Sequence, residues 1–150
     1  MSQARQVGGV SQVVRNDVNS AALWWAGPLT VVVAVLLVFA TRWLAFARVD
    51  LPAGFPPLTY GGLAFFTVML VGLGVLVFVG CAMWSPRPIS LYRRIALVAL
   101  ALSMIPDLLL PGNVEGATWP AAIVLMIAHV AAWAPTVFIL TNRTLIGKRI

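Results

Sequence analysis

Residues 60–84 read YGGLAFFTVMLVGLGVLVFVGCAMW, an apolar run without a single charged side chain. A helix rises ~1.5 Å per residue, so about 20 apolar residues cross a hydrocarbon core ~30 Å thick. Three further apolar runs, roughly 22–47, 95–110 and 119–141, occupy most of the rest of the 150-residue chain. Because unpaired backbone amides are costly in hydrocarbon, each run is expected to be helical. The sequence therefore predicts an all-α protein with four transmembrane helices.

The composition favours a single membrane domain. Hydrophobic residues make up 61% of the chain and charged residues 9%, whereas roughly 25% of a soluble domain is charged. We divide the chain into a polar N-terminal tail or interfacial helix (1–20), a four-helix transmembrane domain (21–142) and a basic C-terminal tail (143–150). Short connections make neighbouring helices antiparallel, which predicts an up-down-up-down bundle.

The basic side chains predict how the bundle is oriented in the membrane. One group lies in the two tails and in the connection between the second and third helices: Arg5, Arg15, Arg87, Arg93, Arg94, Arg143, Lys148 and Arg149. The opposite side has Arg42 and Arg48. The positive-inside rule then places both termini in the cytoplasm of a multi-pass protein in the cell (inner or plasma) membrane. Because the basic residues flank helix ends, we exclude nucleic acid as a partner despite the net charge of +6.

A few polar side chains interrupt the apolar runs. Counted from the helix ends at ~1.5 Å per residue, Arg42 and Asp107 lie near the outer surface. Thr67, Ser103 and His129 lie nearer the bilayer centre. Polar groups at these depths rarely face lipid, because exposure there is costly. We therefore expect two layers inside the bundle: an outer ion pair of Arg42 with Asp107, and a central group of Ser103, His129 and Thr67.

Each layer has a structural and a functional interpretation. Arg42 can extend its side chain to the outer interface, and Asp107 can line a water-filled outer vestibule. His129 can join two helices through Ser103, or it can carry a proton or bind a ligand in an outward-facing pocket. Trp133 lies one turn below His129, where a flat ligand such as a quinone could stack. The same residues also make ordinary packing.

The sequence offers no catalytic set and no metal site. The chain has one histidine, so a bis-histidine haem would need an oligomer, and a zinc site lacks ligands. Cys81 is the only cysteine and has no partner for thiol exchange. A nucleophile elbow and a phosphate-binding glycine loop are both missing. Enzymatic activity is therefore the least favoured interpretation.

The second half of the chain contains the stretches RRIALVALALSMIPDLLLP (93–111) and AAIVLMIAHVAAWAPTVFIL (121–140). With these stretches the chain resembles a family of small bacterial four-helix membrane proteins of unknown function. The positions that match the family are Ser103, Pro106, Leu125, Met126 and His129. The match covers residues 93–140 specifically. It implies the fold and the membrane location but no activity.

Two functions from different classes fit these observations. We interpret the chain as a non-enzymatic accessory, assembly or scaffold subunit of the inner membrane. The alternative is small-molecule binding or proton-linked transport through an outward-facing pocket lined by Ser103, Asp107 and His129. No cofactor is expected, although a bound lipid, quinone or pigment is left open, as is assembly into a homo-oligomer or a larger membrane complex. A cavity that reaches His129 from outside would favour the alternative.

Overall fold

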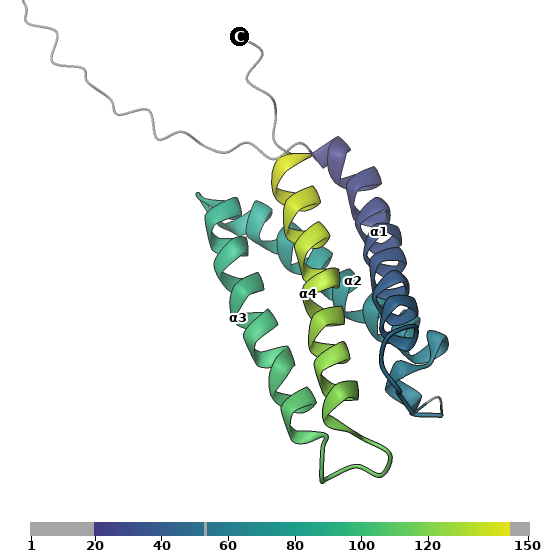
Figure 1. Ribbon diagram of the computed structural model, residues 1–150. Helices are drawn as coiled ribbons and strands as arrows, with labels where there is room; N and C mark the ends of the chain where they lie inside the picture. The colour runs from purple at the N-terminus through teal and green to yellow at the C-terminus, as the bar shows by residue number, and fades with distance from the viewer. Residues whose placement is uncertain (1–19, 53, 145–150) are drawn as a thin grey trace, which may run out of the picture.

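The computed structural model describes residues 20–52 and 54–144. In these residues the regular structure is helical: α1 (Ser20–Phe46), the 3₁₀ helix η1 (Pro56–Leu58), α2 (Tyr60–Trp84), α3 (Pro88–Leu109) and α4 (Trp119–Asn142) (Figure 1). Four of these helices are long and apolar enough to span a membrane. For the described residues, this confirms the predicted helical architecture with four helices able to cross a membrane. Most of the two predicted terminal segments, 1–20 and 143–150, lies outside the described residues.

The third helix begins earlier than the hydropathy predicts. The sequence places its start near Ile95, whereas α3 begins at Pro88. Proline is favoured at the first helical position, because its fixed φ suits the helix and its missing N–H needs no partner there. Arg93 and Arg94 therefore lie on α3 and not in the loop before it. These two arginines lowered the local hydropathy and hid the first turns of the helix.

Helix α4 occupies the middle of the packing. It contacts α1, α2 and α3, and its contact with α1 is the most extensive. Figure 1 shows α4 between α1 and α3, with α2 behind them. The start of α1 and the end of α4 lie at the same end of the bundle, which we call the tail end. We call the opposite end, which carries η1 and the α3–α4 loop, the η1 end.

The core consists of two apolar clusters, one in each half of the bundle. The cluster toward the tail end contains Phe78, Cys81, Ile89, Tyr92, Ala96 and Leu140. Within it, the rings of Phe78 and Tyr92 meet edge to face at 4.9 Å. The cluster toward the η1 end contains Val38, Leu51, Phe55, Leu58, Leu63, Ala121, Val124, Leu125 and Ala128. Large apolar side chains also cover the outside of all four helices, as expected for a surface that meets lipid.

The α1–α2 loop folds back over the η1 end of the bundle. Its side chains Leu51, Phe55 and Leu58 are buried, and Phe55 is only 3% exposed. Proline at the first two positions of η1 presets the turn that directs Leu58 inward. This end of the bundle is therefore filled by loop side chains. The α3–α4 loop turns at Gly112 and Gly116, whose φ angles of +86° and +77° are readily adopted only by glycine.

Candidate functional site

Asp107 and His129 contact each other between α3 and α4. Nδ1 of His129 lies 2.9 Å from Oδ2 of Asp107 and 3.0 Å from the carbonyl oxygen of Leu125, one turn earlier on α4. A carbonyl oxygen can only accept, so Nδ1 carries the proton and its N–H faces two acceptors. The N–H is directed toward Leu125, and the buried Oδ2 of Asp107 is left without a well-aligned donor.

The two side chains meet although the sequence places them at different depths. Side chains in an α-helix lean toward the N-terminus of their own helix. Helices α3 and α4 run in opposite directions beside each other (Figure 1). The side chains of Asp107 and His129 therefore lean toward one another. This lean shortens the separation that counting residues from the helix ends predicts.

Arg42 has different partners from those the sequence suggested. Its Nε donates to the carbonyl oxygen of Leu58 at 2.6 Å. Its guanidinium carbon lies 4.2 Å from the ring centre of Phe46 and 4.0 Å from that of Tyr60. The structure thus does not form the expected Arg42–Asp107 pair. The reason is η1, which brings an open carbonyl group and an aromatic ring beside α1.

The expected central group is also not brought together. The hydroxyl of Ser103 donates to the carbonyl oxygen of Leu100 on its own helix, at 2.8 Å. Thr67 is buried on α2, and the described residues include no hydrogen bond from it to Ser103 or His129. A serine or threonine hydroxyl in a helix can bond a carbonyl of the preceding turn. In lipid, where no water competes, that local bond needs no partner helix.

Trp133 forms a bond between helices that the sequence did not suggest. Its indole Nε1 donates to the carbonyl oxygen of Ala96 on α3, at 2.9 Å. Nearer the tail end, Nη2 of Arg93 donates to Oγ1 of Thr141 at 3.1 Å. We call the three contacts Asp107–His129, Ala96–Trp133 and Arg93–Thr141 the α3–α4 seam. On α4 the members are spaced by four and eight residues, which places them on one face of the helix.

Only part of this seam could have been found in the sequence. The positions of His129, Trp133 and Thr141 on α4 follow a helical repeat that a pattern search can detect. The carbonyl group of Ala96 has no sequence signal, because every residue carries one. Because the hydropathy pattern places Arg93 in a loop, the sequence does not predict its bond to Thr141.

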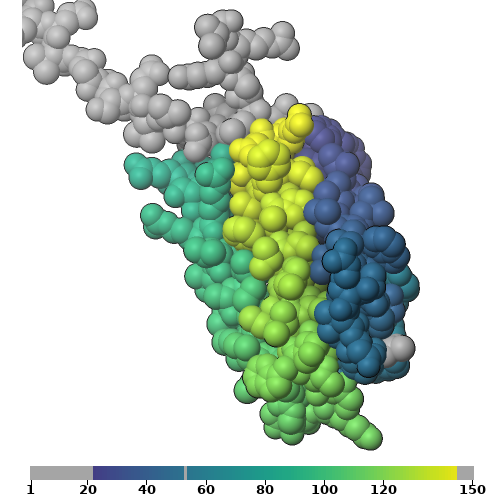
Figure 2. All heavy atoms as spheres, viewed as in Figure 1, coloured from purple at the N-terminus to yellow at the C-terminus, as the bar shows by residue number. Residues whose placement is uncertain are grey.

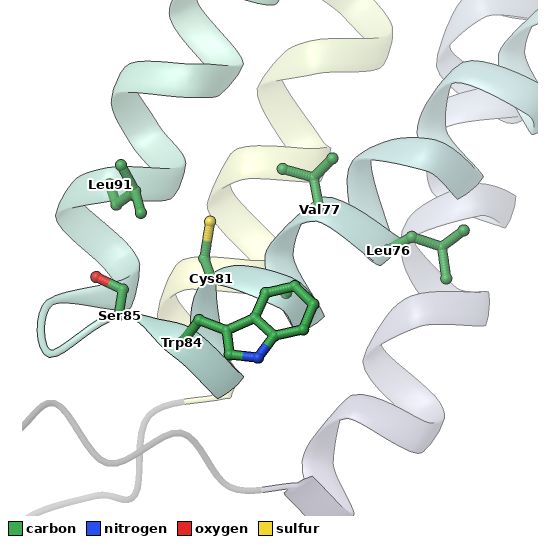
Figure 3. A pocket seen from close by; sticks show the side chains of 7 residues that line it. Leu76, Val77, Cys81, Trp84, Ser85 and Leu91 are labelled. Atoms are coloured by element: carbon green, nitrogen blue, oxygen red, sulfur yellow. The ribbon is translucent and has the colours of Figure 1, made fainter.

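Lateral grooves open on the surface of the described residues, and the two best defined are not lined by the seam residues. One lies between α1 and α4, has a volume of about 580 Å³, and is lined by Thr41, Leu44, Ala45, Val49, Pro120, Ile123, Val124 and Ile127. The other lies between α2 and α3 (Figure 3). Figure 2 shows the side chains of α4 filling the space between α1 and α3 on the face it displays. In residues 20–52 and 54–144, no group of three or more His, Cys, Asp or Glu side chains is placed to hold a metal ion.

The core at the η1 end lies directly beside His129. Phe55 and Leu58 belong to one apolar cluster with Leu125 and Ala128, which precede His129 on α4. The alternative interpretation of the sequence places an outward-facing pocket at this level. The loop side chains Phe55 and Leu58 are buried at the end of the bundle where such a pocket would open.

Comparison with known proteins identifies the family of this chain. Residues 18–145 match a family of unknown function (DUF6069). The chain belongs to this family. The matched region includes all four helices and is therefore much longer than residues 93–140, which carry the resemblance seen in the sequence. No curated protein and no solved structure matches the chain.

Proposed function

We propose that this member of DUF6069 is a non-enzymatic membrane protein that acts as an accessory, assembly or scaffold subunit of a bacterial inner membrane. The α3–α4 seam carries this proposal. Trp133 on α4 donates to the Ala96 carbonyl oxygen on α3 at 2.9 Å, and Arg93 on α3 donates to Oγ1 of Thr141 on α4 at 3.1 Å. Polar groups used in this way hold membrane helices together, since apolar attraction between such helices is weak. The polar side chains of Trp133, Arg93 and Thr141 are thus used in contacts between α3 and α4.

Native mass spectrometry of the full chain, extracted from its own membrane in mild detergent, tests this role. We expect a stoichiometric complex with a second copy or with another membrane subunit. The same complex should survive the double substitution Asp107→Asn with His129→Gln, because both replacements keep hydrogen-bonding groups of similar size. A quinone or pigment bound one-to-one, visible in the absorption spectrum and lost in this variant, would contradict the proposal.

We also propose an up-down-up-down topology with both termini in the cytoplasm. At the tail end the described basic residues are Arg87, Arg93, Arg94 and Arg143, whereas Arg42 and Arg48 lie toward the η1 end. Acidic residues Asp50 and Glu115 follow α1 and precede α4, also at the η1 end. The positive-inside rule assigns the more basic tail end to the cytoplasm.

Labelling of single cysteines checks this topology. In a Cys81→Ser background, Glu115→Cys should react with a membrane-impermeant maleimide on intact cells or spheroplasts. Ser2→Cys should react only after the membrane is permeabilised. Labelling of Ser2→Cys from outside, with Glu115→Cys protected, would reverse the orientation.

Proton-linked transport is the second candidate, and the Asp107–His129 contact favours it. A buried carboxylate 2.9 Å from the only imidazole of the chain is a pair that can exchange a proton. Liposomes that contain the purified protein and a pH-sensitive dye would reveal such a function. Proton movement that His129→Gln abolishes, while the fold is retained, would replace the scaffold proposal with this one.

A further inference from the structure

The groove between α2 and α3 opens at the tail end of the bundle. It has a volume of about 450 Å³ and is lined by Leu76, Val77, Gly80, Cys81, Trp84, Ser85 and Leu91. Figure 3 shows Val77, Cys81 and Trp84 on α2, with Leu91 on α3 across from them. From Trp84, the last residue of α2, to Leu76 the groove runs about 12 Å along the helix at ~1.5 Å per residue. It therefore starts at the end of a membrane span and continues along its apolar length.

Two arginines lie near Leu91, the groove residue on α3. Arg87 is the N-cap of α3, and its carbonyl oxygen accepts the backbone N–H of Leu91 at 3.1 Å. Arg94 follows Leu91 by three residues, which places these two on one face of the helix. Both arginines are exposed, and neither forms an ion pair within the described part of the chain. The described acidic residues Asp50, Asp107 and Glu115 all lie toward the η1 end. The walls of the groove are therefore mainly apolar, and the positive charges of Arg87 and Arg94 lie near its open end.

We propose that this groove binds an anionic phospholipid. One acyl chain lies along Leu76, Val77 and Gly80, and the phosphate group lies between Arg87 and Arg94. A guanidinium group presents paired donors that match the oxygens of a phosphate. Tryptophan is favoured at the level of lipid headgroups, and Trp84 occupies that level here. The inference depends on the helices spanning a bilayer and not on the scaffold role proposed above.

Charge substitutions test the headgroup contact. The full chain in detergent is titrated with phosphatidylglycerol or phosphatidylcholine, and bound lipid is counted by native mass spectrometry. We expect Arg87→Gln with Arg94→Gln to weaken phosphatidylglycerol binding about 25-fold, because each exposed ion pair of an arginine with the phosphate contributes roughly a factor of five. Binding of phosphatidylcholine should fall much less, because its choline ammonium balances the charge of the phosphate. The control Arg48→Gln with Arg143→Gln removes the same charge elsewhere and should have less than a twofold effect. An equal loss in the control would show general attraction to anionic surfaces and overturn the site.

A matched pair of glycine substitutions tests the acyl-chain contact. A Cβ at Gly80 would lie 3.3 Å from the Trp84 ring in the groove, whereas a Cβ at Gly72 would meet no atom within 4 Å. Gly80→Leu should therefore lower the binding of both lipids at least tenfold, and Gly72→Leu should leave it unchanged. Unaltered binding in a folded Gly80→Leu protein would overturn the proposal. If Gly80→Leu does not fold, the arginine substitutions still test whether the groove binds an anionic phospholipid.

Competition with inorganic phosphate separates a lipid site from a phosphate site. Because the groove provides apolar contact to the acyl chain, millimolar phosphate should not displace phosphatidylglycerol. Displacement by phosphate alone would show that the two arginines hold a free anion, and the lipid assignment would then be wrong.

Discussion

Replacing His129 with leucine should lower the free energy of unfolding by about 2 kcal/mol, more than the ~1 kcal/mol of an ordinary polar contact between membrane helices. Leucine removes the imidazole ring, whose Nδ1 lies 2.9 Å from Oδ2 of Asp107. Asp107, which is 5% exposed, then keeps no nearby donor for that oxygen. Removing one partner of a buried pair costs about 3–5 kcal/mol in soluble proteins. A chain unfolded within the membrane finds other partners, which reduces that cost.

Reversible unfolding by sodium dodecyl sulfate in mixed micelles would measure this effect. His129→Gln keeps a donor near the carboxylate and should lose less than half as much stability as His129→Leu. The double substitution His129→Leu with Asp107→Leu leaves no unpaired carboxylate. Its loss in the free energy of unfolding should therefore be about 1 kcal/mol smaller than the sum of the losses of the two single variants. Single losses that add to within about 0.5 kcal/mol would show that the two side chains are energetically independent.

Replacing Gly62 with alanine should also cost about 2 kcal/mol, the scale of overpacking in a filled site. A Cβ at this position would lie 2.4 Å from the carbonyl oxygen of Pro56 and 3.1 Å from Oγ1 of Thr59. The Pro56 oxygen accepts the backbone N–H of Thr59 at 3.2 Å and the Thr59 hydroxyl at 2.7 Å. It can move away only if η1 opens. The substitution should therefore disturb the loop that covers the η1 end, including the Leu58 carbonyl that binds Arg42.

The neighbouring glycine is the matched control. A Cβ at Gly61 would meet no atom within 4 Å, and alanine is favoured over glycine in a helix by about 1 kcal/mol. Gly61→Ala should thus be neutral or stabilising in the same unfolding measurement. If both glycines respond alike, the close approach of η1 to α2 does not contribute to stability.

The sequence identified several residues of the site but not their partners. The apolar runs make Asp107, His129 and Trp133 candidates for inward-facing positions, because polar groups inside a membrane span rarely face lipid. Depth alone then suggested that Asp107 would meet Arg42 and that His129 would meet Ser103. The structure instead joins Asp107 to His129 and Trp133 to the Ala96 carbonyl. Depth along one axis omits the lean of each side chain and the rotation of each helix.

By itself, the sequence determined that four segments of this chain form helices able to cross a bilayer. Hydropathy summed over about 20 residues is insensitive to the identity of any one of them, and a helix satisfies its backbone groups within the segment. Only the tertiary structure decided which polar groups meet. It placed the α1–α2 loop over the bundle, gave Arg42 the Leu58 carbonyl, and brought the leaning side chains of Asp107 and His129 together. These outcomes depend on loop paths, helix rotation and backbone carbonyl groups, and carbonyl groups are the same at every residue.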